Sequence, residues 1–110
     1  MTVKCDTLDN LTVIRVAGRL DSVTCSELED KTLRTIGAGQ HNLILDLSEV
    51  PFISSAGLRV ILVATKKVHG QGKLVLCGLK AQVREIIEMA GFHNIIKVYD
   101  DLEGAKAVFG

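Results

Sequence analysis

Residues 42–70 read NLILDLSEVPFISSAGLRVILVATKKVHG, and this stretch decides the fold. Its first part, residues 42–47, is a nearly continuous apolar run that is too short for a buried helix and therefore predicts a central strand. From Ser54 or Ser55 the chain is apolar almost all round until it stops at Gly70, with two lysines near the end, which predicts a largely buried helix. A central strand that leads directly into such a helix is typical of α/β proteins.

The segment before this stretch predicts a hairpin followed by a helix. Two short β-rich runs, Val3–Thr7 and Leu11–Ala17, are separated by Asp9 and Asn10, either of which accepts a positive φ. The following helix is expected to start near Ser22 and Thr24 as N-caps and to end at a group of glycines. Its buried face is expected to carry Cys25, Leu28, Thr32 and Ile36.

The segment after residue 70 repeats the alternation of strand and helix. Residues 73–77 predict a strand, and apolar residues recur at helical spacing between 79 and 91. Residues 95–99 predict a last strand. Asp100 and Glu103 then have the spacing of a capping box at the start of a short final helix.

The resulting order is β-β-α-β-α-β-α-β-α, within one domain that spans residues 1–110. Right-handed crossovers between alternating strands and helices predict a mixed, mostly parallel α/β sheet of about five strands with about four helices. In open sheets of this kind the loops at the carboxyl ends of the strands form one functional edge. The loops at residues 18–24 and 47–57 are therefore the candidate functional segments.

Composition excludes several classes of function. The chain has 110 residues, 47% of them hydrophobic, and its 13 basic and 13 acidic residues leave no net charge, which disfavours nucleic-acid binding. No apolar run reaches the roughly 18 residues of a membrane span, and the first residues lack the pattern of a secretory signal. We therefore expect a cytoplasmic protein that does not insert into membranes.

The cysteines and histidines predict neither a disulfide framework nor a metal site. The three cysteines, Cys5, Cys25 and Cys77, are far apart in sequence and are expected to be reduced thiols that are buried or half-buried. The three histidines each stand alone, without a second ligand at helical spacing. No metal and no cofactor is expected.

Ser54 and Ser55 stand where the predicted helix begins. The first N–H groups of a helix lack internal acceptors and the helix dipole is positive at that end, so a phosphate on either serine is stabilised there. Both serines are also ordinary N-caps in many proteins. The local residues alone leave the two interpretations open.

The stretch from Asp46 to Leu58, DLSEVPFISSAGL, resembles the signature of bacterial anti-sigma factor antagonists, in which an aspartate-led strand, a Phe, a pair of hydroxyls and Gly-Leu follow in fixed order. A second segment, Gly18-Arg-Leu-Asp21 with Thr24 downstream, is similar to the Gly-x-Leu-Asp segment of the same family. With the predicted element order, the resemblance to this STAS-domain family covers essentially the whole chain.

The resemblance implies a partner switch. The unphosphorylated protein binds an anti-sigma factor that is also a serine kinase, phosphorylation ends that binding, and a metal-dependent serine phosphatase restores it. ATP belongs to the kinase. The phosphoserine falls on Ser55, while Ser54 replaces the aspartate of many family members and is the alternative acceptor. The implied partner-binding residues are Asp21, Ser22, Thr24, Ser54, Ser55, Ala56, Gly57 and Leu58.

Other functions remain alternatives. The carboxylate of Asp21 is as compatible with a helix start as with a partner contact. The sequence lacks a Gly-x-Ser-x-Gly nucleophile elbow, a phosphate loop and a metal cluster, so an enzyme is not expected. The main alternative is a STAS scaffold without the switch, as a stressosome core component or a transporter-associated subunit. The sequence predicts no oligomeric state.

Overall fold

Strands and helices follow one another in the predicted order within residues 2–109, which the computed structural model describes. One short 3₁₀ helix, η1, is added before the last strand. The bounds are β1 Thr2–Leu8, β2 Leu11–Ala17, α1 Cys25–Gly37, β3 Asn42–Glu49, α2 Ser55–Val68, β4 Lys73–Cys77, α3 Ala81–Met89, η1 Phe92–Asn94, β5 Val98–Tyr99 and α4 Leu102–Ala107.

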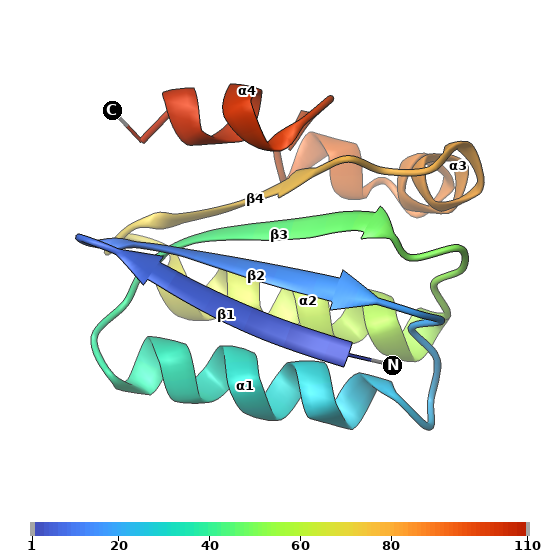
Figure 1. Cartoon of the computed structure of the whole chain (residues 1–110). Coiled ribbons are helices and arrows are strands. Elements are labelled where there is room, and N and C mark those ends of the chain that lie inside the picture. Colours follow the sequence, from blue (N-terminus) through green and yellow to red (C-terminus); the bar gives the residue numbers. More distant parts are fainter. Residues whose placement is uncertain (1, 110) are drawn as a thin grey trace.

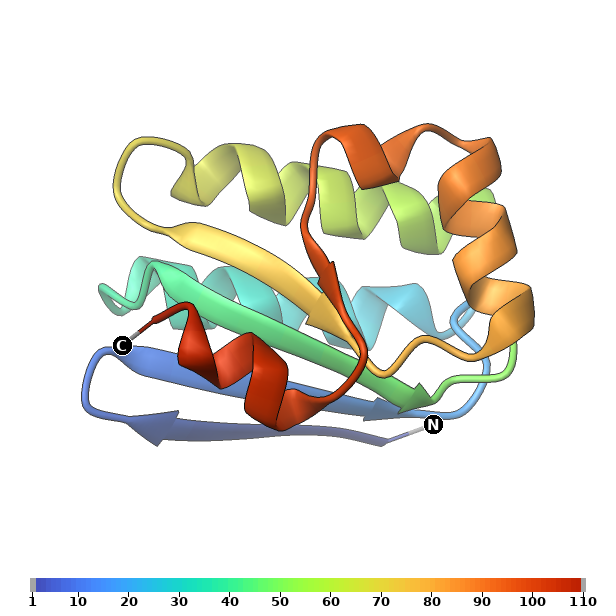
Figure 2. The same ribbon diagram turned by 90° about the horizontal axis from the view of Figure 1, so that it is seen from above.

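The five strands form one sheet in the order β1-β2-β3-β4-β5. The hairpin partner β1 is antiparallel to β2, with Asp9 at φ 57° in the turn, and the remaining pairs are parallel. The carboxyl ends of β2, β3 and β4 consequently lie at the same edge of the sheet, where the loops to α1, α2 and α3 leave it (Figures 1 and 2). The mixed, mostly parallel sheet is confirmed.

Helices cover both faces of the sheet, and the pleat divides the core into two layers. α1 and α2 lie on one face and α4 lies on the other (Figure 1). Within β3, Leu43 and Leu45 face the larger core under α1 and α2, while Ile44 between them faces the smaller core under α4. Both faces of β3 are therefore buried, as its continuous apolar run predicts.

The expectation that α2 is largely buried is wrong. Its buried residues are Gly57, Val60, Ile61, Ala64 and Val68. Leu62 and Val63 are only partly buried and Arg59 is exposed, because α2 packs against the sheet on one side and has solvent on the other. Neither α2 nor any other helix within residues 2–109 has both the length and the apolar character needed to cross a membrane.

The C-terminal boundaries also differ from the prediction. The last strand is only Val98–Tyr99, because the chain before it forms η1 and turns Ile96 into the main core. The cap of α4 is Asp101, whose side chain accepts a hydrogen bond of 2.8 Å from the N–H of Gly104. The neighbouring Asp100, predicted as the cap, is exposed.

The three cysteines lie in different environments. Cys25 and Cys77 are buried, as expected, but Cys5 is exposed on the edge strand β1. Burial, followed by the nearby carboxylates of Asp46 and Asp101, raises the pKa of the Cys77 thiol to about 12. Cys77 is therefore an unreactive core residue.

Candidate functional site

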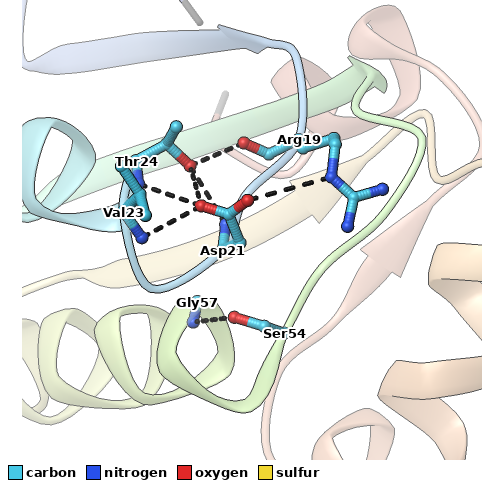
Figure 3. Close-up of polar contacts among 6 residues, drawn as sticks. All are labelled: Arg19, Asp21, Val23, Thr24, Ser54 and Gly57. Atoms are coloured by element: carbon cyan, nitrogen blue, oxygen red, sulfur yellow. Dashed lines mark hydrogen bonds and ion pairs between the residues drawn. The ribbon is translucent and has the colours of Figure 1, made fainter.

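Backbone hydrogen bonds join the loops that precede α1 and α2. The N–H of Leu20 donates to the carbonyl of Phe52 at 2.9 Å, and the N–H of Ser54 donates to the carbonyl of Leu20 at 2.8 Å. Two segments more than 30 residues apart in sequence thus become neighbours at the carboxyl edge of the sheet (Figure 3). We call the surface formed by residues 19–24 and 52–58 the rim.

Gly57 allows this close approach. A Cβ at this position would lie 2.9 Å from side-chain carbons of both Leu20 and Ile53, and 3.1 Å from the carbonyl oxygen of Leu20. Such distances are shorter than van der Waals contact, so only glycine fits without a shift of the loop. Gly57 is buried against its own chain, and its role is to hold the two halves of the rim together.

The two serines of the rim have different environments. Ser54 is the N-cap of α2 and is partly buried, and its Oγ accepts a long hydrogen bond of 3.4 Å from the N–H of Gly57 (Figure 3). Ser55 is the first residue of α2 and is exposed to solvent. The cap prediction therefore holds for Ser54, and Ser55 is the more exposed of the two serines.

Asp21 organises the other half of the rim (Figure 3). Its Oδ1 accepts hydrogen bonds of 3.0 Å from the N–H groups of both Val23 and Thr24. Thr24 is the N-cap residue of α1, as one of the two predicted positions, and Ser22 is not. The Thr24 side chain makes no capping hydrogen bond, because its hydroxyl donates backward to the carbonyl of Arg19 at 2.6 Å. The carboxylate of Asp21 instead orders the turn that precedes the helix.

These hydrogen bonds keep Asp21 ionised. The N–H of Thr24, followed by that of Val23, stabilises the carboxylate and holds the pKa of Asp21 below its ordinary value. The carboxylate is also 3.8 Å from Nε of Arg19. The rim therefore carries a fixed negative charge next to a positive one.

Arg19 links this charge to an aromatic side chain. Its guanidinium carbon lies 4.5 Å from the centroid of the Phe52 ring, a cation–π contact. A hollow of about 330 Å³ next to Phe52 is also lined by Gln82, Glu85 and Ile86 of α3. This hollow connects the rim, through Phe52, to one face of α3.

The model of the STAS domain family matches residues 2–105. The chain belongs to the STAS family. Over 110 residues it is 37% identical to BtrV of Bordetella bronchiseptica, whose name assigns it provisionally as an anti-sigma factor antagonist, and the alignment covers 99% of this chain and 95% of BtrV.

Solved structures agree with this family. An anti-sigma factor antagonist from Mycobacterium paratuberculosis superposes with a TM-score of 0.91 at 24% identity, covering 97% of this chain and 92% of that one. SpoIIAA superposes at 18% identity in its unphosphorylated form, with a TM-score of 0.75, and in its phosphorylated form, with 0.76. The coverage is 97% of this chain for both, and 94% and 99% of the respective SpoIIAA chains. These likenesses establish the STAS fold.

The STAS fold brings all eight predicted partner-binding residues to the rim. Ser22 and Ser55 are exposed, and Gly57 is buried. The remaining residues are partly buried, namely Asp21, Thr24, Ser54, Ala56 and Leu58. The side chains of Ala56 and Leu58 pack against the main core. The surface available to a partner is therefore narrower than the predicted set.

Three further rim residues were not predicted. Val23 leaves 82% of its surface exposed, and Arg19 and Phe52 form the cation–π pair. Arg19 lies within the Gly18-Arg-Leu-Asp21 segment, but no sequence spacing connects it to Phe52. Only the backbone bridge places the two side by side.

The described part of the STAS domain offers no group of three His, Cys, Asp or Glu side chains arranged to hold a metal ion. What the rim provides is an exposed hydroxyl, a fixed carboxylate, an arginine and exposed apolar surface. This combination is suited to binding another protein.

Proposed function

We propose that the protein is an anti-sigma factor antagonist that works as a partner switch. In its unphosphorylated form the rim binds an anti-sigma factor with serine kinase activity and so releases a sigma factor. The observation that carries the proposal is the exposure of Ser55 on the first turn of α2, next to a serine whose hydroxyl caps the helix. The protein acts by binding in the cytoplasm, and it needs no cofactor.

Phosphorylation transfers the terminal phosphoryl group of ATP, held by the kinase, to Oγ of Ser55. The new bond joins Oγ to phosphorus, the bond from that phosphorus to the oxygen of ADP breaks, and the hydroxyl proton leaves. The modified side chain carries about 1.5 to 2 negative charges near neutral pH. A partner surface that packs on the neutral hydroxyl then has to desolvate a dianion, and binding is lost.

The scaffold does not have to refold for this change. Ser55 lies at the N-terminus of a 14-residue helix, whose dipole and unpaired N–H groups favour a negative charge. The chain superposes about equally well on the unphosphorylated and phosphorylated forms of SpoIIAA, which supports a changed surface on an unchanged fold. A metal-dependent serine phosphatase then hydrolyses the phosphate and restores the binding form.

The deciding experiment is phosphorylation by the cognate anti-sigma factor and ATP, followed by mass spectrometric mapping of the modified residue. The wild-type protein and Ser54→Ala are expected to carry one phosphate on Ser55, and Ser55→Ala none. Labelling of Ser55→Ala at the wild-type level would move the acceptor to Ser54. Absence of labelling in the wild type, with the anti-sigma factor active on itself or on another antagonist, would favour a scaffold role in a stressosome or a transporter.

A further inference from the structure

The first two turns of α2 place an arginine one turn after the exposed serine. Arg59 follows Ser55 by four residues within α2, so both side chains lie on the same side of the helix. Helical side chains lean toward the N-terminus, which carries the guanidinium of Arg59 back over the turn that contains Ser55. Arg59 is exposed, and exposed side chains change rotamer on a fast timescale.

Arg59 already pairs with a carboxylate on the neighbouring helix. Its Nη2 is 3.6 Å from Oε2 of Glu29 in α1, and the two side chains are 59% and 29% exposed. An ion pair of this length and exposure is weak, because solvent screens it. A stronger anion within reach of Arg59 competes effectively with Glu29.

We propose that the phosphate on Ser55 is held by Arg59, which gives up its contact with Glu29. The inference rests on the proposed function, since it concerns the phosphorylated state of the same site. A phosphate carries more charge than a carboxylate and presents three oxygens to the planar fork of the guanidinium. Phosphorylation then changes the charge pattern on two helices, because Glu29 on α1 loses its cation.

The other charged groups around Ser55 do not take this role. Arg19 is occupied by the ring of Phe52 and by Asp21 on the opposite half of the rim. Asp21 and Glu85 are carboxylates, so neither attracts a phosphate. The lysines of α2, Lys66 and Lys67, lie in its last turn. Arg59 is the cation that the helix itself places over the phosphate.

The pairing has a consequence for both steps of the switch. A phosphate that is held against α2 presents a fixed anion to the anti-sigma factor, so repulsion does not depend on a mobile side chain. The phosphatase has to withdraw the phosphate from Arg59 before hydrolysis. Removing Arg59 is therefore expected to speed dephosphorylation, while the kinase step, which meets a neutral serine, is changed less.

The test places phosphoserine at position 55 during translation, so that no kinase is needed. ³¹P NMR then follows the second ionisation of the phosphate, which lies near pH 6 in a free phosphoserine. Arg59→Gln is expected to raise this pKa by about half a unit, since an opposite charge nearby favours the dianion. Glu29→Gln frees Arg59 and is expected to lower the pKa, and Arg19→Gln is expected to leave it unchanged.

The proposal is supported if Arg59→Gln raises the phosphate pKa and Glu29→Gln lowers it. The phosphate pKa of Arg59→Lys should then lie between those of Arg59→Gln and the wild type. The proposal would be overturned if the phosphate pKa of Arg59→Gln equalled that of the wild type, or if Arg19→Gln raised the pKa instead. Circular dichroism of each unphosphorylated variant checks that the fold is kept. Because the phosphate is installed directly, failure of this test is distinct from failure of the kinase to modify Ser55.

Discussion

Two of the helices that start at the carboxyl edge of the sheet, α1 and α2, begin in contrasting ways. At the start of α1, one carboxylate oxygen of Asp21 binds two backbone N–H groups at 3.0 Å, and the hydroxyl of Thr24 is tied to a backbone carbonyl. At the start of α2, a single hydrogen bond of 3.4 Å caps the helix, and the next serine is exposed. One half of the rim is fixed by hydrogen bonds, and the other half leaves a hydroxyl open to modification.

This contrast indicates that the two halves of the rim have different roles. A partner needs a surface with defined geometry, which the Asp21 half supplies, and a switch needs a group whose chemistry can change without disturbing the fold, which Ser55 supplies. Gly57 joins the two halves by letting Leu20 pack against the first turn of α2. Four substitutions test this comparison, in order of decreasing expected effect.

The largest effect is expected for Ser55→Asp. A permanent carboxylate at the exposed position weakens binding to the anti-sigma factor by roughly a hundredfold, about 3 kcal/mol, because a negative charge must be desolvated when the partner docks. Calorimetric titration measures the affinity, and the circular dichroism spectrum and the melting temperature are expected to stay near wild type. Equal affinity of both proteins would show that Ser55 lies outside the docking surface.

Gly57→Ala is expected to destabilise the protein by disturbing the contact between the two halves of the rim. Its new Cβ meets Leu20 and Ile53 at distances that force the loop to move, at about 2 kcal/mol of unfolding free energy. Urea denaturation measures the loss. Gly37→Ala is the matched control, because nothing lies within 4 Å of a Cβ at that position, and its stability should stay within about 0.5 kcal/mol of wild type.

Ser54→Ala removes the cap of α2 and leaves Ser55 in place. The long hydrogen bond to Gly57 predicts a loss at the low end of the range for N-caps, about 0.5 to 1 kcal/mol in urea denaturation. Phosphorylation of Ser55 should continue at a rate close to wild type. A variant that keeps full stability but can no longer be phosphorylated would reverse the roles that we give to the two serines.

Asp21→Asn is expected to have the smallest effect, visible in the pH dependence of stability. Asparagine keeps an oxygen acceptor for the N–H groups of Val23 and Thr24 but has no charge. The pKa of Asp21 is lower in the folded than in the unfolded protein, so the carboxylate stabilises the fold above about pH 4 and this contribution disappears as the pH falls further. Melting temperatures of the two proteins should differ near neutral pH and converge in acid. A constant difference would show that the charge of Asp21 plays no part.

Much of the fold could be predicted from local sequence. The apolar run at residues 42–47 is short and continuous, and the structure confirms it as the start of β3. The N-cap at Ser54 was predicted from the same physics, because serine accepts a hydrogen bond from the first turn wherever a helix begins. The prediction was wrong where two adjacent residues are equally good N-caps. Asp100 was predicted as the cap of α4, and Asp101 is the cap in the structure.

The α1 cap shows why such errors arise. Ser22 and Thr24 both have side chains suited to capping, but the hydroxyl of Thr24 binds the carbonyl of Arg19 and the carboxylate of Asp21 instead. The loop that holds these groups is bridged to the segment before α2 through Leu20 and Ile53. A contact between distant segments has no local signature in a single sequence. The same holds for Arg19 with Phe52 and for Arg59 with Glu29, which pair across different elements.

The sequence by itself determined the order of strands and helices, the place where α2 begins and the pair of hydroxyls at that place, since periodicity and capping act between residues close in the chain. Tertiary structure decided which of these hydroxyls faces solvent, how the turn before α1 is hydrogen-bonded and which arginine lies near the site. These outcomes depend on how separate elements pack on the sheet, and packing is set by contacts between residues far apart in sequence.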